Sequence, residues 1–181
     1  LSVRIPGAER HFLINPFGML FEEVTASSLV KIDLAGRKVE PSPHRVNEAG
    51  FIIHSAIHAA REDALCVMHL HTLPGIAVSC QAQGLLPLNQ FAMLFNGQLA
   101  YHDYEGIALE ADEQPRLVRD LGSARAMLLR NHGTLTVGRS VGEAFCAMYW
   151  LERSCAAQVL AQSGGAVLKI PGADEQATVA R

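Results

Sequence analysis

Two histidines, His69 and His71, stand one residue apart in the apolar run VMHLHT. Short apolar runs are typical of buried strands, and on a strand residues i and i+2 project from the same face. The two imidazoles are therefore expected to lie side by side, at a spacing suited to one shared metal ion. An HxH pair is also compatible with two histidines tolerated in a core, so other residues must decide.

A third histidine completes a candidate ligand set. The segment RNHGTL follows the apolar run AMLL, and His132 within it stands directly before a glycine. Functional side chains in α/β proteins are often displayed where a strand ends in a tight turn. Three neutral imidazoles leave a divalent ion with an open coordination position, which is typical of catalytic sites. The pattern predicts Zn²⁺, or another divalent transition metal, at His69, His71 and His132, acting as a Lewis acid or activating water.

The other histidines carry weaker signals. His54 and His58 are four apart on one predicted helix, but HSAIH lacks the glutamate of the HExxH metalloprotease pattern, which favours a packing role. His102 stands in YHDYEG together with Tyr104, and the composition of this segment predicts a polar, aromatic loop. That segment is compatible with a pocket lining, a subunit interface or a plain surface turn.

Composition narrows the class of protein. Of the 181 residues, 49% are hydrophobic and 18% charged, which predicts a folded domain with a sizeable core. The net charge is −3 and no basic cluster is present, so we expect no nucleic-acid partner. No apolar run reaches the length of a membrane span. Cysteines without CxxC spacing predict reduced, buried thiols and a cytoplasmic location; they are Cys66, Cys80, Cys146 and Cys155.

Apolar periodicity predicts strands and helices in alternation, which indicates an α/β fold with helices packed on a sheet. Strands are expected over residues 11–15, 29–34, 64–71, 125–133 and 134–138, and helices over 51–61, 72–81, 89–97, 115–121 and 140–163, with a loop over 41–50. We expect one domain over 1–170 and a flexible tail over 171–181. The sequence opens without methionine, which is compatible with an upstream segment that it lacks.

Several segments, in order, resemble the class II aldolase/adducin family, in particular the adducin head and its bacterial relatives. They are SVRIPG, FLINPFG, GFIIHSAIHAA, VMHLHT, YHDYEG, LLRNHGTLTVG and the helix that follows. The resemblance implies a three-layer α/β/α fold in homo-oligomers with fourfold symmetry, with sites near subunit interfaces. In the aldolase members it implies zinc on three histidines, which match His69, His71 and His132. Those enzymes cleave a phosphorylated ketose through an enediolate.

The same resemblance exposes a missing acid/base group. The aldolases carry a catalytic glutamate four residues before the histidine that matches His54, and here that position is Gly50. Glycine has no proton to transfer, so a contribution of roughly 10² to 10⁴ in rate is not supplied in the usual way. The two preceding residues, serines that bind phosphate in the aldolases, are Glu48 and Ala49. A carboxylate facing a phosphate dianion would be repulsive, which favours an unphosphorylated substrate.

Other matched positions are mixed. In the turn INPFG, Phe17 replaces the threonine of the aldolases' phosphate loop, whereas Gly18 is kept. The tyrosine that assists proton transfer in the aldolases aligns with Gln90. The resemblance implies substrate contacts at Gly18, Asn47 and Gln90.

Two functions remain open. The first is a divergent zinc-dependent lyase, performing aldol cleavage or dehydration on a small hydroxy-carbonyl compound. Glu48 would then replace the missing carboxylate, or a neighbouring subunit would deliver Tyr104 or His102. The second is a non-catalytic, adducin-like oligomerisation or binding module, since the animal adducin head belongs to an actin-associated protein. The sequence names neither the substrate nor the metal.

Overall fold

The computed structural model describes residues 1–7, 9–107, 111–165 and 167–179. One sheet organises this part of the chain, with its strands in the order β3-β2-β1-β4-β7-β6-β5. Every neighbouring pair is antiparallel except β5 and β6, which are parallel. The strands are β1 (Ser2–Arg4), β2 (Phe12–Ile14), β3 (Val30–Ile32), β4 (Cys66–Leu70), β5 (Leu99–His102), β6 (Ala126–Leu129) and β7 (Gly133–Gly138).

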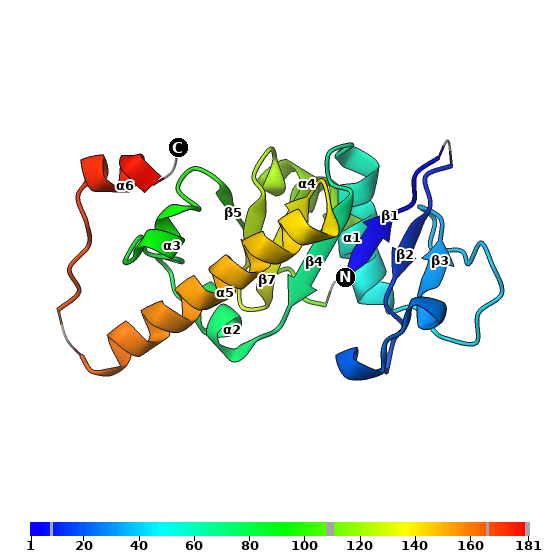
Figure 1. Cartoon of the computed structure of the whole chain (residues 1–181), viewed down its shortest axis with the longest axis horizontal. Coiled ribbons are helices and arrows are strands. Elements are labelled where there is room, and N and C mark those ends of the chain that lie inside the picture. Colours follow the sequence, from blue (N-terminus) through cyan, green and yellow to red (C-terminus); the bar gives the residue numbers. More distant parts are fainter. Residues whose placement is uncertain (8, 108–110, 166, 180–181) are drawn as a thin grey trace.

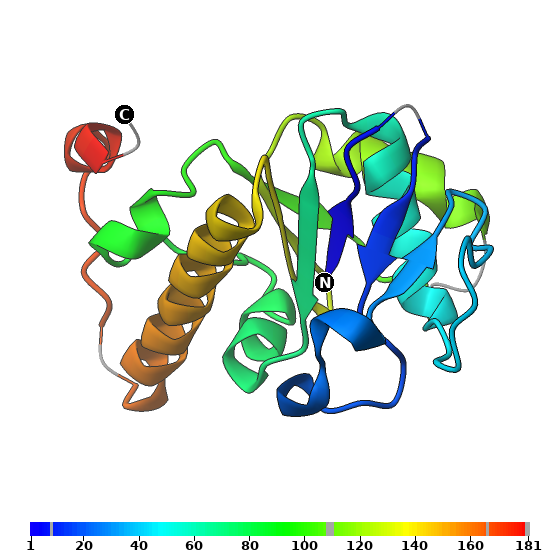
Figure 2. The same cartoon turned by 45° about the vertical axis from the view of Figure 1, so that its right-hand side comes forward.

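Helices cover both faces of this sheet, which gives the three-layer α/β/α arrangement expected from the resemblance (Figures 1 and 2). One face carries α2 (Leu73–Ser79) and the long α5 (Val141–Ser163), and the other carries α1 (Glu48–Ala60) and α4 (Gln114–Leu121). The remaining elements are α3 (Gln90–Met93), α6 (Ala173–Val179) and the 3₁₀ turns η1 (Phe21–Glu23), η2 (Ala26–Ser28) and η3 (Ala111–Glu113).

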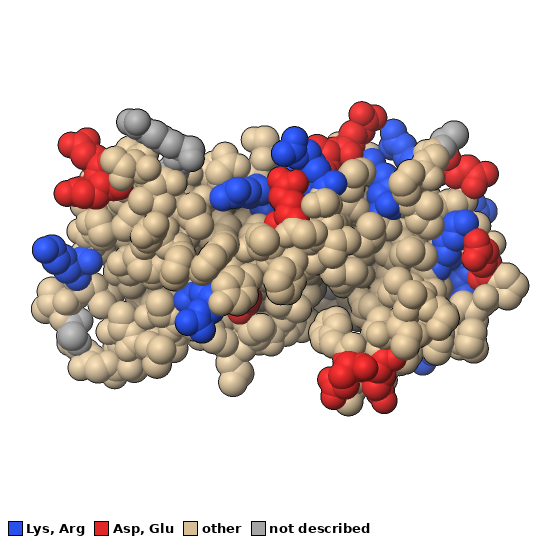
Figure 3. Space-filling model, in the orientation of Figure 1, with Lys and Arg blue, Asp and Glu red and all other residues tan. Residues whose placement is uncertain are grey.

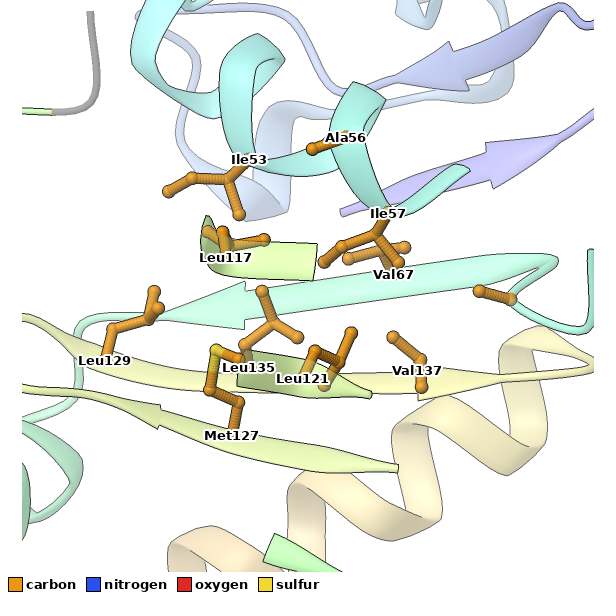
Figure 4. Packing of buried hydrophobic residues seen from close by; sticks show 11 residues of the cluster. Ile53, Ala56, Ile57, Val67, Leu117, Leu121, Met127, Leu129, Leu135 and Val137 are labelled. Atoms are coloured by element: carbon orange, nitrogen blue, oxygen red, sulfur yellow. The ribbon is translucent and has the colours of Figure 1, made fainter. Parts of the chain in front are cut away.

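The largest apolar cluster lies between the sheet and the α1/α4 layer (Figure 4). Ile53 and Ile57 of α1 are one turn apart, so both point from one face of the helix onto the strands. They meet Val67 of the central strand β4 and Leu135 of β7, each fully buried. This packing fixes α1 across the sheet, with its N-terminal end at the carboxyl end of β4.

Side-chain caps set where three helices begin. Asn47 caps α1 by accepting a hydrogen bond from the Gly50 amide, Thr72 caps α2 through the Gly75 amide, and Ser140 caps α5 through the Glu143 amide. The cap at Asn47 corrects the prediction of a loop through Gly50, because α1 already begins at Glu48. Asparagine followed by Glu48 is a strong start signal that loop-like composition upstream had obscured.

The other predicted strands and helices are confirmed, whereas β1 and β5 lie where no strand is predicted, and two further differences lie in the second half of the chain. The helix expected over 89–97 is a single turn, α3, because the backbone after Met93 continues as tighter turns with i→i−3 hydrogen bonds, such as Phe95 N–H to the Ala92 carbonyl. The segment after Pro171 contains the short helix α6, and Asn96 donates a hydrogen bond to Gln176 at 3.1 Å; the predicted flexibility of this tail stays a prediction. Residues 180–181 of that tail lie outside the described residues.

Two of the four cysteines are buried and two are exposed. Cys66 and Cys155 are buried as predicted, whereas Cys80 and Cys146 are exposed, because each lies on the outward side of its helix end or face. Among the described helices, none is long and apolar enough to cross a membrane. Charges of both signs gather at the margins in Figure 3, while the face over α5 is largely uncharged.

Candidate metal centre

The end of β4 presents two of the three histidines. His69 pairs with Leu135 of β7 in the antiparallel register, and His71 follows directly after the strand ends at Leu70. The chain then enters α2 through its cap, Thr72. The i, i+2 spacing therefore places both rings at one end of the sheet, with centroids 4.5 Å apart.

The turn between β6 and β7 supplies the third histidine, and its sequence explains the conformation. Asn131 has φ 56°, a left-handed conformation that asparagine tolerates better than most residues. A Cβ on Gly133 would lie 2.3 Å from the Leu70 carbonyl oxygen, so only glycine permits the close approach of β7 to β4. NHG is thus a tight turn that carries His132 over the end of β4.

The three imidazoles converge through their Nε2 atoms. His71 Nε2 lies 2.7 Å from His69 Nε2 and 2.9 Å from His132 Nε2. The ligand atoms of all three residues lie within 4.8 Å of one another, and this is the only such group of three or more potential metal ligands in the described chain. The predicted triad is therefore brought together.

The protonation states suit a cation. Burial, followed by the neighbouring His132 and His71, lowers the pKa of His69 to about 3. Burial, followed by His71, lowers the pKa of His132 to about 4. His69 Nδ1 donates to the Thr134 carbonyl at 2.9 Å, which leaves the Nε2 lone pair directed at the other two rings. Neutral imidazoles with converging lone pairs are the donor set that zinc and related divalent ions bind.

A carboxylate that the sequence did not reveal supports this arrangement from α5. Glu152 accepts hydrogen bonds from the hydroxyl of Thr72 and from that of Thr134, the latter at 2.5 Å. Thr134 also receives the His69 hydrogen bond, so Glu152 holds the segments on both sides of the triad. The signal was weak: within residues 144–160, only Glu152 and Arg153 are charged. Nothing in the sequence indicates which of the two points inward.

A cavity of about 400 Å³ opens beside the triad. Its polar lining residues come from β2, α1 and the end of β4, and neither a carboxylate nor a Lys or Arg side chain is among the described residues that line it. The lining consists of Leu1, Ile14, Asn15, Phe21, Asn47, Gly50, His54, His69, Leu70, His71 and Thr72. The missing carboxylate at Gly50 is thus not replaced within this cavity.

The structure separates the residues that the resemblance suggested for the substrate. Asn47 lines the cavity as expected, although its side-chain oxygen is engaged in capping α1. Gly18 and Gln90 are exposed and are not among the lining residues. Glu48 is exposed at the first position of α1, so its carboxylate does not take the place of the missing one. Helical geometry explains this, because residues two apart face different sides.

His102 and Tyr104 also lie away from the cavity lining. His102 is 3% exposed at the end of β5, and its ring nitrogens contact Asp120 at 2.7 Å and Glu113 at 3.3 Å. The burial of His102 corrects the alternative of a plain surface turn, whereas its delivery to a neighbouring subunit stays a prediction. Tyr104 is 54% exposed and lines a separate open pocket with Arg130 and Asn131, so its delivery to another subunit stays a prediction.

Residues 1–159 match the Class II Aldolase and Adducin N-terminal domain family. The chain belongs to this family. It is 58% identical over 165 residues to an aldolase class 2 family protein of Caulobacter vibrioides, covering 91% of this chain and 64% of that protein. It is 46% identical to alpha-adducin of Rattus norvegicus, covering 91% of this chain and 23% of the adducin. The chain thus spans less than two thirds of either relative.

The fold comparison agrees. An L-fuculose 1-phosphate aldolase from Glaciozyma antarctica superposes with a TM-score of 0.87 at 31% identity, covering 99% of this chain and 70% of that one. Family membership and the three-layer fold, both expected from the sequence, are confirmed. The family relationship also gives the histidine triad its context, since it occupies the part of the chain that the match covers.

Proposed function

We propose that this chain is the metal-binding domain of a divergent class II aldolase-family lyase, with zinc as the preferred ion and a small, unphosphorylated hydroxy-carbonyl compound as substrate. The observation that carries the proposal is the convergence of three imidazoles beside an open cavity. Such a site suits either aldol cleavage or dehydration, because both reactions proceed through negative charge on a carbonyl-derived oxygen.

The residues of this chain divide the work at the site. His69, His71 and His132 would hold the ion, and an ion there would supply Lewis-acid stabilisation of a substrate oxygen. The Thr134 carbonyl fixes the tautomer and orientation of His69, and Glu152 anchors both Thr72 and Thr134. Asn15, Asn47 and Thr72 add polar atoms to the wall of the cavity, where they would orient a hydroxylated substrate.

The preference for an unphosphorylated substrate rests on the residues that line the cavity and not on Glu48. Glu48 lies outside the cavity, so repulsion by its carboxylate does not decide the matter. Instead, the described lining offers no Lys or Arg side chain to neutralise a phosphate dianion. Heat stability in the presence of dihydroxyacetone phosphate tests this point, and marked stabilisation would contradict it.

A second function, a non-catalytic binding module, is favoured by the absence of a lining carboxylate. Gly50 has no side chain, and no other described lining residue is an Asp or Glu. The similarity to alpha-adducin is compatible with a domain that keeps the fold and uses it for assembly. In this alternative, metal binds but no bond of the substrate is broken.

One experiment separates these functions. Zinc-loaded protein is incubated with a panel of unphosphorylated hydroxy-aldehydes, hydroxy-ketones and hydroxy acids, and aldehyde or dehydrated product is measured. The lyase predicts turnover that His132→Ala abolishes and that His44→Ala, a change away from the cavity, leaves intact. Silence across the whole panel with stoichiometric zinc bound would establish the binding module instead.

We also propose that the chain forms a homo-oligomer, as the resemblance implies. The support is an apolar surface on α5, where Phe145 is 58% exposed, Tyr149 47% and Leu160 74%. Light scattering on the purified protein tests this, with a fourfold mass expected for the tetramer.

A further inference from the structure

A buried hydrogen-bond chain connects β1 to two histidines of α1. The Ser2 hydroxyl lies 2.7 Å from His54 Nδ1 and 2.7 Å from His58 Nε2. All three residues are at most 3% exposed, so water does not compete for these bonds. At the far end, His58 Nδ1 lies 3.0 Å from the Ala64 carbonyl oxygen.

The direction of the chain follows from the carbonyl, which only accepts. His58 must therefore carry its proton on Nδ1, which leaves His58 Nε2 as an acceptor for the Ser2 hydroxyl. With its proton donated, the Ser2 oxygen accepts from His54 Nδ1. His54 is thereby fixed as the tautomer whose Nε2 carries a lone pair.

The free nitrogen of His54 opens into the cavity beside the triad. His54 lines that cavity, and no described residue donates a hydrogen bond to its Nε2. In the described chain, the sole fully enclosed side-chain nitrogen or oxygen without a partner is Arg125 Nε. His54 Nε2 is therefore unpartnered but not sealed, which leaves the cavity as the space that it faces.

We propose that His54 Nε2 accepts a hydrogen bond from a hydroxyl group of the ligand that binds in this cavity. This inference rests on the proposed function and names a structural requirement of its substrate: a hydroxyl group beside the one that approaches the metal. The cavity has no lining carboxylate, so His54 is its strongest uncharged acceptor outside the triad. Ser2 and His58 act as positioning residues, because they hold the imidazole in the accepting tautomer.

The tautomers can be read directly in the metal-free protein. Long-range ¹H–¹⁵N spectra of histidine-labelled protein distinguish protonated from unprotonated ring nitrogens, and His54→Asn and His58→Gln spectra assign the signals. We expect Nδ1 to carry the proton in both His54 and His58. A proton on His54 Nε2 would overturn the proposal, because that nitrogen would then donate rather than accept.

The ligand arm compares dihydroxyacetone with hydroxyacetone, two ketones that differ by one hydroxyl group. Binding to cobalt-substituted protein is followed through the cobalt absorption spectrum. Wild type is expected to prefer dihydroxyacetone by about threefold to tenfold beyond the twofold advantage of its equivalent ends, as one hydrogen bond predicts. His54→Asn, which keeps a donor for Ser2 but removes the distal acceptor, should abolish that preference.

The control and the contrary outcomes separate the two proposals. His44→Ala removes a histidine that lies outside both the cavity lining and this hydrogen-bond chain, so it is the control and should leave the preference unchanged. Equal binding of both ketones to wild type, or a preference that survives His54→Asn, would overturn the role of His54 while leaving the metal site intact. Cobalt that binds without any response to either ketone would overturn the proposed substrate class, and this inference with it.

Discussion

The cavity has two walls that differ in what they keep. One wall is the end of β4, where His69 and His71 line the cavity and converge with His132 of the β6–β7 turn; Thr134 and Glu152 hold this arrangement. The wall formed by α1 carries Asn47, Gly50 and His54 and offers no carboxylate among its described lining residues. One wall is thus equipped for a metal ion, whereas the other lacks the usual group for proton transfer. Metal binding and catalytic turnover are therefore separable in this fold, and each wall can be altered on its own.

The largest expected effect comes from dismantling the metal wall. In the double variant His69→Ala and His71→Ala, two of three ligands are removed, and we expect zinc affinity to fall by more than about a thousandfold. Elemental analysis after gel filtration measures this as a change from one zinc per chain to none. His44→Ala provides the control for loss of a histidine elsewhere.

Retention of stoichiometric zinc in the double variant would break the comparison, because the ion would then be held by other residues. Wild-type protein that stays metal-free under zinc-replete conditions would also contradict it, because the three histidines would then not bind zinc. Either result would assign the NHG turn and the end of β4 to packing alone.

His58, buried on α1 but outside the cavity lining, predicts a pH effect on the stability of the metal-free protein. Burial lowers the pKa of His58 to about 4, from an ordinary 6.5, so the unfolded chain binds a proton between these values and the folded chain does not. Stability therefore falls as the pH drops from about 6.5 to about 4, by up to about 3 kcal/mol for this residue. Urea unfolding of wild type and His58→Gln at several pH values measures it, and equal slopes would contradict the prediction.

The three candidate metal ligands could be predicted from the sequence because the patterns that indicate them are local. The i, i+2 spacing of His69 and His71 requires only a strand, and the sequence NHG encodes its own turn through Asn131 and Gly133. Apolar periodicity likewise placed most strands and helices, since burial on one or both faces determines it. The packing role expected of His54 and His58 is compatible with their burial and hydrogen bonds, although His54 also lines the cavity.

The other contacts at the site could not be predicted from the sequence, because they join segments that are far apart in the chain. Ser2 lies more than fifty positions from the two histidines to which it is hydrogen-bonded. A strand of three residues is too short for a periodic pattern that would predict this contact. Glu152 contacts Thr72 eighty residues earlier in the chain. Only the resemblance to the family places Glu48 in the site. In the structure Glu48 is the exposed first residue of α1 and is not among the residues that line the cavity. Contacts between distant segments depend on how layers pack, which single residues do not encode.

Glu152 offers a way to weaken the metal wall without touching a ligand. In Glu152→Gln the charge is lost, and the side chain no longer accepts two hydroxyl hydrogen bonds equally well. We expect zinc affinity to fall by about tenfold to a hundredfold, as is typical of groups that orient metal ligands. Competition with a chromophoric chelator measures it. Glu143→Gln, exposed on the same helix, is the control, and an equal loss in both variants would exclude a specific role.

The smallest expected effect comes from Gly50→Glu, which restores a carboxylate to the α1 wall. The atoms nearest to a Cβ at Gly50 would be those of Asn47, at 3.6 Å, which is ordinary van der Waals contact. Gly50→Glu replaces glycine in the first turn of α1 and places a negative charge at the helix N-terminus, which should raise the free energy of unfolding by about 1 kcal/mol. Gly50→Gln has the same shape but no charge and no transferable proton. If the two walls are separable, lyase activity on hydroxy-carbonyl compounds should rise in Gly50→Glu alone, with zinc content unchanged. Loss of zinc in Gly50→Glu, or equal activity in both variants, would show that position 50 does not face the metal wall as the cavity indicates.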